Sequence, residues 1–199
     1  MNITRWLVPK IAWDDFPAMF GVAILGALIA GCYGIVHDQI TYAIGPEYFT
    51  KFKFEQFRYA DFGFPNWVFV SEIGFLATWW VGFAIAWFLA RWLIPDQPRV
   101  AAYRRILKAI GIVFCCGCVS GLVGFAYGNW RGPDSDYYDW EYLTRGMGLT
   151  EIWPFVRVAY IHNAGYLGGL IGLVLALWLI RPEPKISKAK VVSREERTQ

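Results

Sequence analysis

The two histidines of this 199-residue chain are the residues whose placement says most about its chemistry. His37 closes the first long apolar stretch and is followed by Asp38, while His162 lies about five residues into the charge-free part of the fourth stretch. Glu72 begins the charge-free part of the second stretch. At 1.5 Å per helical residue, Glu72 and His162 lie roughly 8–12 Å inside the same end of a helical bundle, and His37 lies at or just above that level. The pattern therefore predicts one layer in which three helices each present an ionisable side chain.

Ionisable groups at membrane depth are costly, face the bundle interior and mark candidate functional sites. In a first interpretation, one transition metal is held by a set of nitrogen and oxygen donors, namely His37, His162, Glu72 and Asp38. In a second, His37 and His162 are the axial ligands of one haem b between the first and fourth helices. In a third, the layer is a structural polar network in which Glu72 bonds to His162 or pairs with Arg157. Four neighbouring side chains are placed to orient the ligands by hydrogen bonds: Tyr33, Asn163, Tyr166 and Arg157.

Motifs of standard enzymes are absent from the sequence, including HExxH, the P-loop, GxSxG and the paired Glu-x-x-His of di-iron bundles. Whether the chain is an enzyme stays open; His37 with Asp38, or His162 with Glu72, would be the general-base pairs. The leading hypothesis is a metal- or haem-binding membrane subunit. The alternative is a non-enzymatic membrane scaffold or assembly factor that binds lipid or a protein partner through its aromatic outer loops, chiefly residues 46–62.

The composition places these residues in a membrane protein. Hydrophobic residues make up 56% of the chain, aromatic residues 19% and charged residues 18%, with a mean hydropathy of +0.34. A soluble domain carries about 25% charged residues and fewer apolar ones. Disordered, collagen-like and coiled-coil chains are excluded because they need polar or repetitive sequence, and a net charge of +3 does not favour nucleic acid.

Four apolar stretches are long enough to cross a bilayer core of about 30 Å as helices. The spans are expected at about residues 16–37, 67–94, 107–130 and 156–180. The sequence thus predicts an all-α integral membrane protein, a four-transmembrane-helix bundle formed by residues 1–180 as one domain. Two long extracytoplasmic loops, at about residues 38–66 and 131–157, and a basic cytoplasmic tail, residues 181–199, complete the predicted organisation.

The distribution of Lys and Arg predicts the orientation of the bundle. The N-terminal arm, the connection between the second and third spans and the C-terminal tail hold most of the 19 basic residues. The other two loops hold only Lys51, Lys53, Arg58, Arg131, Arg145 and Arg157. Positive charge collects on the cytoplasmic side, so we expect a multi-pass protein of the cell (inner) membrane with both termini cytoplasmic.

Small residues four positions apart predict close helix packing, within one chain or in a homo-oligomer or a complex with another membrane protein. The pairs are Gly165 with Gly169, Gly168 with Gly172, Gly117 with Gly121, Gly124 with Gly128, Ala27 with Gly31, and Ala30 with Gly34. The aromatic residues within 46–57 are expected to insert into the headgroup region. Cys32 ends a lipoprotein-like cleavage box, but Asp14 and Asp15 in the preceding arm favour an uncleaved first helix, and whether Cys32 is lipidated stays open.

Overall fold

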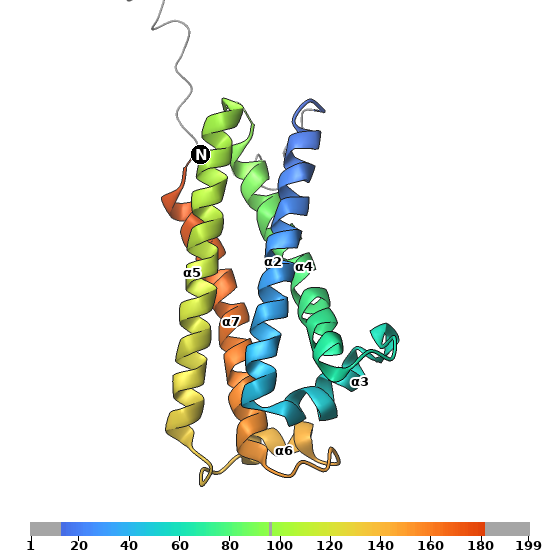
Figure 1. Cartoon of the computed structure of the whole chain (residues 1–199). Helices are drawn as coiled ribbons and strands as arrows, with labels where there is room; N and C mark the ends of the chain where they lie inside the picture. Colours follow the sequence, from blue (N-terminus) through green and yellow to red (C-terminus); the bar gives the residue numbers. More distant parts are fainter. Residues whose placement is uncertain (1–12, 96, 182–199) are drawn as a thin grey trace, which may run out of the picture.

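The computed structural model describes residues 13–95 and 97–181, and every regular element in those residues is a helix. Four helices are long and apolar enough to cross a membrane: α2 (Phe16–Ile44), α4 (Asn66–Leu93), α5 (Arg99–Arg131) and α7 (Ile152–Leu179). Shorter helices occupy the two long connections: η1 (Tyr48–Lys53), α3 (Phe54–Gln56), η2 (Arg58–Ala60) and α6 (Tyr138–Thr144). Both connections lie at one end of the bundle (Figure 1). The predicted all-helical bundle is confirmed to this extent, whereas the N-terminal arm (1–12) and the basic tail beyond residue 181 lie outside the described residues.

The observed helices run beyond several of the predicted spans. α2 continues past His37 to Ile44, and α5 begins at Arg99 rather than near residue 107. A stretch without charged residues shows which part of a helix can lie in the hydrocarbon core of a membrane. The helix itself ends only where the backbone conformation or the capping changes. α4 and α5 accordingly begin directly after Pro65 and Pro98, since proline is tolerated only at a helix start.

The four long helices form two closely packed pairs, α2 with α4 and α5 with α7, and few contacts join one pair to the other. In the first pair, Gly34 and Gly74 meet backbone to backbone, since a Cβ on either would overlap the carbonyl oxygen of the other. The Thr78 hydroxyl of α4 lies 2.8 Å from the carbonyl oxygen of Ala30 in the same pair. This arrangement leaves the centre of the bundle between the pairs, where the site lies.

The glycine pairs predicted from sequence divide into two groups. In α7, Gly168 and Gly172 contact α5 closely, because a Cβ on Gly168 would overlap Ser120 and one on Gly172 would lie 2.7 Å from the Cα of Val113. Gly165 and Gly169, on a neighbouring face of α7, would meet no atom within 4 Å. Close packing is therefore confirmed for Gly168 with Gly172, whereas Gly165 and Gly169 make no close contact with another helix within the described residues.

The connection after α2 folds back over the end of the bundle. The carboxylate of Glu47 accepts the backbone N–H of Thr150 at 3.1 Å and that of Glu151 at 3.4 Å, which joins the two long connections. Desolvation raises the pKa of the Glu47 carboxyl, but these hydrogen bonds outweigh it and hold the pKa below its usual value. These hydrogen bonds of Glu47 hold η1 against the N-terminal end of α7.

The aromatic rings of this connection correct one expectation. Tyr48, Phe49 and Phe57 were expected to lie in the headgroup region, but they are only 6%, 0% and 8% exposed. Their burial follows from the fold of η1 over α7, where Tyr48 and Phe49 join a cluster with Phe155. The exposed rings come later in the chain, at Tyr59, Phe62, Phe64 and Trp67.

Candidate functional site

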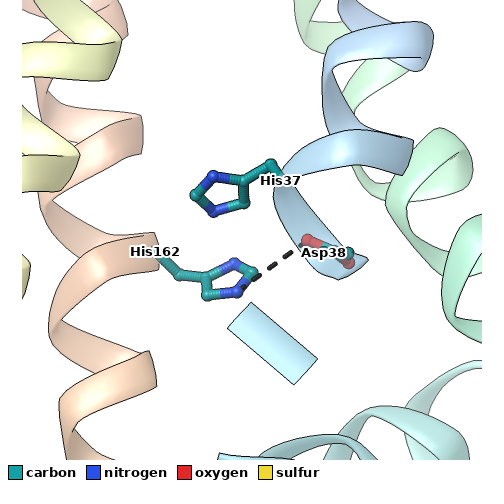
Figure 2. A group of neighbouring side chains, drawn as sticks. All are labelled: His37, Asp38 and His162. Atoms are coloured by element: carbon teal, nitrogen blue, oxygen red, sulfur yellow. Dashed lines mark ion pairs between the residues drawn. The ribbon is translucent and has the colours of Figure 1, made fainter. Parts of the chain in front are cut away.

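Three side chains from two helices converge at the end of the bundle that η1 covers (Figure 2). His37 and Asp38 come from α2 and His162 from α7, and one metal-ligand atom of each lies within 4.8 Å of the others. The Nε2 atom of His162 is 3.9 Å from Oδ1 of Asp38, and the two imidazole centroids are 4.8 Å apart. Asp38 and His162 are 2% and 6% exposed. The structure thus brings together three of the four predicted metal ligands.

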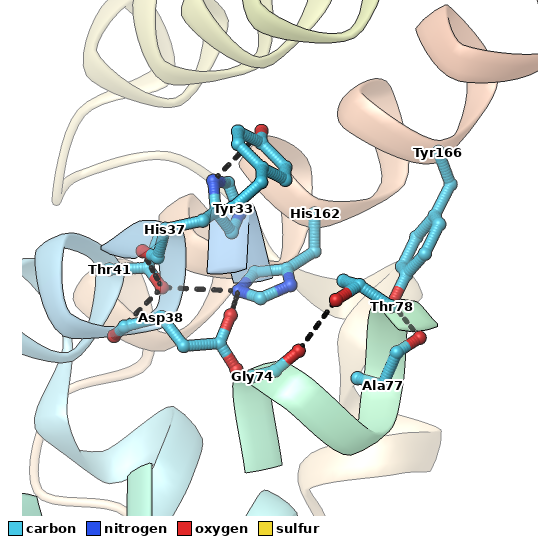
Figure 3. A network of polar contacts seen from close by, with 9 residues as sticks. All are labelled: Tyr33, His37, Asp38, Thr41, Gly74, Ala77, Thr78, His162 and Tyr166. Carbon is cyan, nitrogen blue, oxygen red and sulfur yellow. Dashed lines mark hydrogen bonds and ion pairs between the residues drawn. The ribbon is translucent and has the colours of Figure 1, made fainter. Parts of the chain in front are cut away.

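Hydroxyl groups hold both imidazoles (Figure 3). The Tyr33 hydroxyl, one turn before His37, lies 3.2 Å from His37 Nδ1. Thr41, one turn after His37, lies with Oγ1 3.2 Å from His162 Nε2 and donates to the His37 carbonyl at 3.0 Å. Because its single proton goes to that carbonyl, Thr41 accepts a hydrogen bond from His162. The second nitrogen of each ring, Nε2 of His37 and Nδ1 of His162, makes no hydrogen bond within the described residues and is the atom available to a metal.

Aromatic rings close the outer side of the site. Tyr48 of η1 stacks on His162 with ring centroids 5.1 Å apart and an interplanar angle of 26°, and Phe49 contacts the same imidazole at 6.2 Å. Phe155 of α7 packs against Tyr48 at 5.1 Å. These rings keep water from the imidazole, and charges interact more strongly in such surroundings.

The buried carboxylate of Asp38 is incompletely satisfied. Its Oδ2 atom has no hydrogen-bond partner within the described residues. Lys53 of η1, itself only 7% exposed, interacts electrostatically with this carboxylate, and its Nζ lies 6.0 and 5.5 Å from the centroids of Phe52 and Phe57. Burial lowers the pKa of the Lys53 ammonium, and the charge of Asp38 opposes that shift.

A cavity of about 150 Å³ extends from this cluster between the two helix pairs, and all four long helices line it. The polar residues among its lining are Tyr33, His37, Asp38, Thr78, His162 and Tyr166. The rest of the lining is aliphatic or glycine, apart from Phe114. The cluster therefore forms the polar end of a mostly apolar cavity.

Glu72 is not among the converging ligand atoms. Gln39 donates a hydrogen bond to Ser71 at 2.8 Å, which places this part of α4 level with His37, as the sequence predicts. The Oε2 atom of Glu72 is buried and has no hydrogen-bond partner in the part of the chain that the structure describes. Glu72 thus shares the layer but not the cluster.

Of the four residues predicted to orient the ligands by hydrogen bonds, only Tyr33 makes such a bond to one of the two histidines within the described residues. Tyr33 contacts His37 as expected, whereas Asn163 is exposed and the Tyr166 hydroxyl donates to the Ala77 carbonyl at 3.5 Å. Arg157 donates to Asn129 Oδ1 and to the Ile44 carbonyl, both at 3.1 Å. The expected pairing of Arg157 with Glu72 is therefore wrong, because α7 packs along α5 and makes few contacts with α4.

Three residues near the cluster were not predicted. Thr41 could have been found, since it lies four residues after His37 and so on the same face of α2. Tyr48 and Lys53 carry no such signal, because only the fold of η1 brings them to α7. In a regular helix the spacing of residues in the sequence predicts which side chains share a face. In a folded connection such as the one that contains η1, it does not.

Comparisons of the chain with protein-family models, curated proteins and solved structures found no match. Two imidazoles and one carboxylate beside a cavity are a donor set for Fe(II) or Zn²⁺ with open coordination positions. A haem would have to lie between the imidazoles, which contact each other edge to face, so haem binding requires these two rings to separate.

Proposed function

We propose that this chain is a multi-pass membrane protein that binds a divalent transition-metal ion through His37, Asp38 and His162. The observation that carries the proposal is the convergence of these three residues, with a buried Asp38 oxygen that lacks a hydrogen-bond partner. A buried carboxylate without full pairing is unfavourable, and a bound cation supplies the missing partner. The four long apolar helices support the location in a membrane.

The donors and their surroundings favour iron or zinc. Imidazole suits both ions, and two imidazoles with one carboxylate leave positions open for an oxygen ligand. A metal ion bound here would polarise that oxygen as a Lewis acid. Tyr33 and Thr41 would hold the two imidazoles in orientation, as hydrogen-bond partners of metal-bound histidines do.

The first test is an elemental analysis and an absorption spectrum of the same detergent-purified sample. We expect about one equivalent of iron or zinc per chain, because the three donor atoms lie within 4.8 Å of one another. A Soret band together with iron would instead support the haem alternative. A colourless protein that stays metal-free after chelation and reconstitution with each metal would contradict the proposal.

A second candidate function is supported by the exposed rings Tyr59, Phe62, Phe64 and Trp67, which are 76%, 74%, 55% and 64% exposed. Aromatic residues favour the interface between membrane and water and also the centres of protein interfaces. A scaffold or assembly factor would bind lipid headgroups or a membrane protein through this surface. It becomes the leading candidate if the protein holds no metal.

We further propose that the protein resides in the cell (inner) membrane with both termini in the cytoplasm, since Lys and Arg favour that side. Gly63 and Gly146 lie in exposed turns with φ of +78° and +89°, where a short epitope insertion leaves the helices intact. We expect antibodies to bind both insertions on spheroplasts with intact inner membranes, and tags at either terminus only after lysis. The reverse pattern would contradict the orientation.

A further inference from the structure

The cavity between the helix pairs is long and narrow. Its lining extends along α2 from Gly26 to Asp38, which at 1.5 Å per residue is roughly 18 Å. Its volume of about 150 Å³ is spread over that length. A linear group fits such a space better than a ring system does.

Glycines keep this space open. A Cβ on Gly165 or Gly169 would meet no atom within 4 Å, and one on Gly117 of α5 would come no closer than 3.8 Å to another atom. All three glycines line the cavity. They therefore leave free volume that larger residues would occupy, in contrast to Gly168 and Gly172, which contact α5.

The polarity of the cavity differs between its two ends. His37, Asp38 and His162 lie at the end near η1, and the unpartnered Oδ2 belongs to Asp38, which is only 2% exposed. Towards the other end the lining becomes aliphatic, with Ile85 and Ile110 among its residues. Such a cavity is matched by a molecule with one polar end and one apolar chain.

The cavity reaches the surface of the bundle at the height of the apolar helices. Two of its lining residues, Phe114 and Tyr166, are 48% and 43% exposed. Phe114 contacts Tyr33 across the gap between α5 and α2 at a ring distance of 5.3 Å. In a bilayer the exposed sides of Phe114 and Tyr166 would face lipid chains, which are as apolar as leucine side chains and fill voids by van der Waals contact.

We propose that this cavity binds the single unbranched chain of a membrane lipid, with a hydroxyl or carbonyl oxygen at its end placed against His37, Asp38 and His162. The inference rests on the proposed function, because the open position of the metal is where that oxygen would bind. The chain itself is held by the apolar part of the cavity, independently of the metal. The oxygen of the lipid is therefore the ligand that we assign to the open position of the metal site.

The test uses photolabelling of the full-length protein in lipid nanodiscs. The probe is a saturated long-chain primary alcohol with a diazirine in mid-chain, and unlabelled alcohol is the competitor. The cavity variant is Gly169→Leu, whose side chain enters open space, and the matched control is Gly111→Leu, which also meets open space but does not line the cavity. Gly165→Leu is a second cavity variant, and metal content is measured in every sample.

We expect saturable labelling of the segments that contain Gly117 and Gly165, with a loss of about tenfold in both cavity variants and no loss in Gly111→Leu. Metal content should be unchanged in all three variants. Labelling that the competitor does not reduce, or that persists in both cavity variants, would overturn the lipid inference and leave the metal proposal intact. Saturable labelling of a protein that binds no metal would support lipid binding in the cavity and overturn the proposed metal-binding function.

Discussion

Asp38→Asn is expected to raise the dissociation constant for the divalent metal ion by at least about 100-fold. Changes to residues that merely support metal ligands cost about 10- to 100-fold, and in the proposed site Asp38 is both a ligand and the source of negative charge. Asparagine keeps the size of the side chain and removes that charge. Isothermal titration calorimetry, in which zinc is added to the metal-free protein in detergent, measures the change in the dissociation constant directly.

Two further variants separate this prediction from a structural role of Asp38. Asp139→Asn makes the same substitution on the exposed surface of α6 and should leave the affinity unchanged. If Asp38 only balances the charge of Lys53, Asp38→Asn should destabilise the fold and Asp38→Asn/Lys53→Met should restore stability. Equal zinc affinity in Asp38→Asn and the unmodified protein would rule out Asp38 as a ligand.

The second large effect is expected at the contact between α2 and α4. Gly74→Ala should lower the free energy of unfolding by about 3 kcal/mol or more, because its Cβ would overlap the Gly34 carbonyl and force two backbones apart. The backbone carbonyl cannot move away as the end of a flexible side chain can. Thermal unfolding in one detergent, followed by circular dichroism, measures the loss of stability.

Gly165→Ala is the matched control for this substitution. It makes the same change in another long apolar helix, but its Cβ meets no atom within 4 Å, so we expect stability within about 0.5 kcal/mol of the unmodified protein. Equal stability of Gly74→Ala and Gly165→Ala would mean that α2 and α4 do not pack as described. The pair of variants therefore tests the helix arrangement that positions the site.

The pattern of apolar residues was sufficient to predict four long helices and the common level of the two histidines along the bundle. A long charge-free segment must satisfy its backbone hydrogen bonds within itself when it lies in lipid, and that requirement holds for each segment alone. Counting residues from the ends of the segments then places His37 and His162 at compatible depths. Both results depend on local sequence, so no knowledge of the partners was needed.

Which side chains meet within that layer was decided by tertiary structure. Sequence spacing favoured Glu72 as a ligand over Asp38, but the rotation of α4 against α2, set by the contact of Gly34 with Gly74, leaves Glu72 outside the cluster. Lys53 reaches the site only because η1 folds back over α7.

The glycines of α7 show the same division. Gly165, Gly168, Gly169 and Gly172 are alike in sequence, yet two contact α5 and two leave a cavity open. Hydropathy determines that a helix lies in a membrane, since that depends on the transfer of its own side chains from water. Which face meets which neighbour depends on packing between residues far apart in the chain, and only the folded structure contains that information.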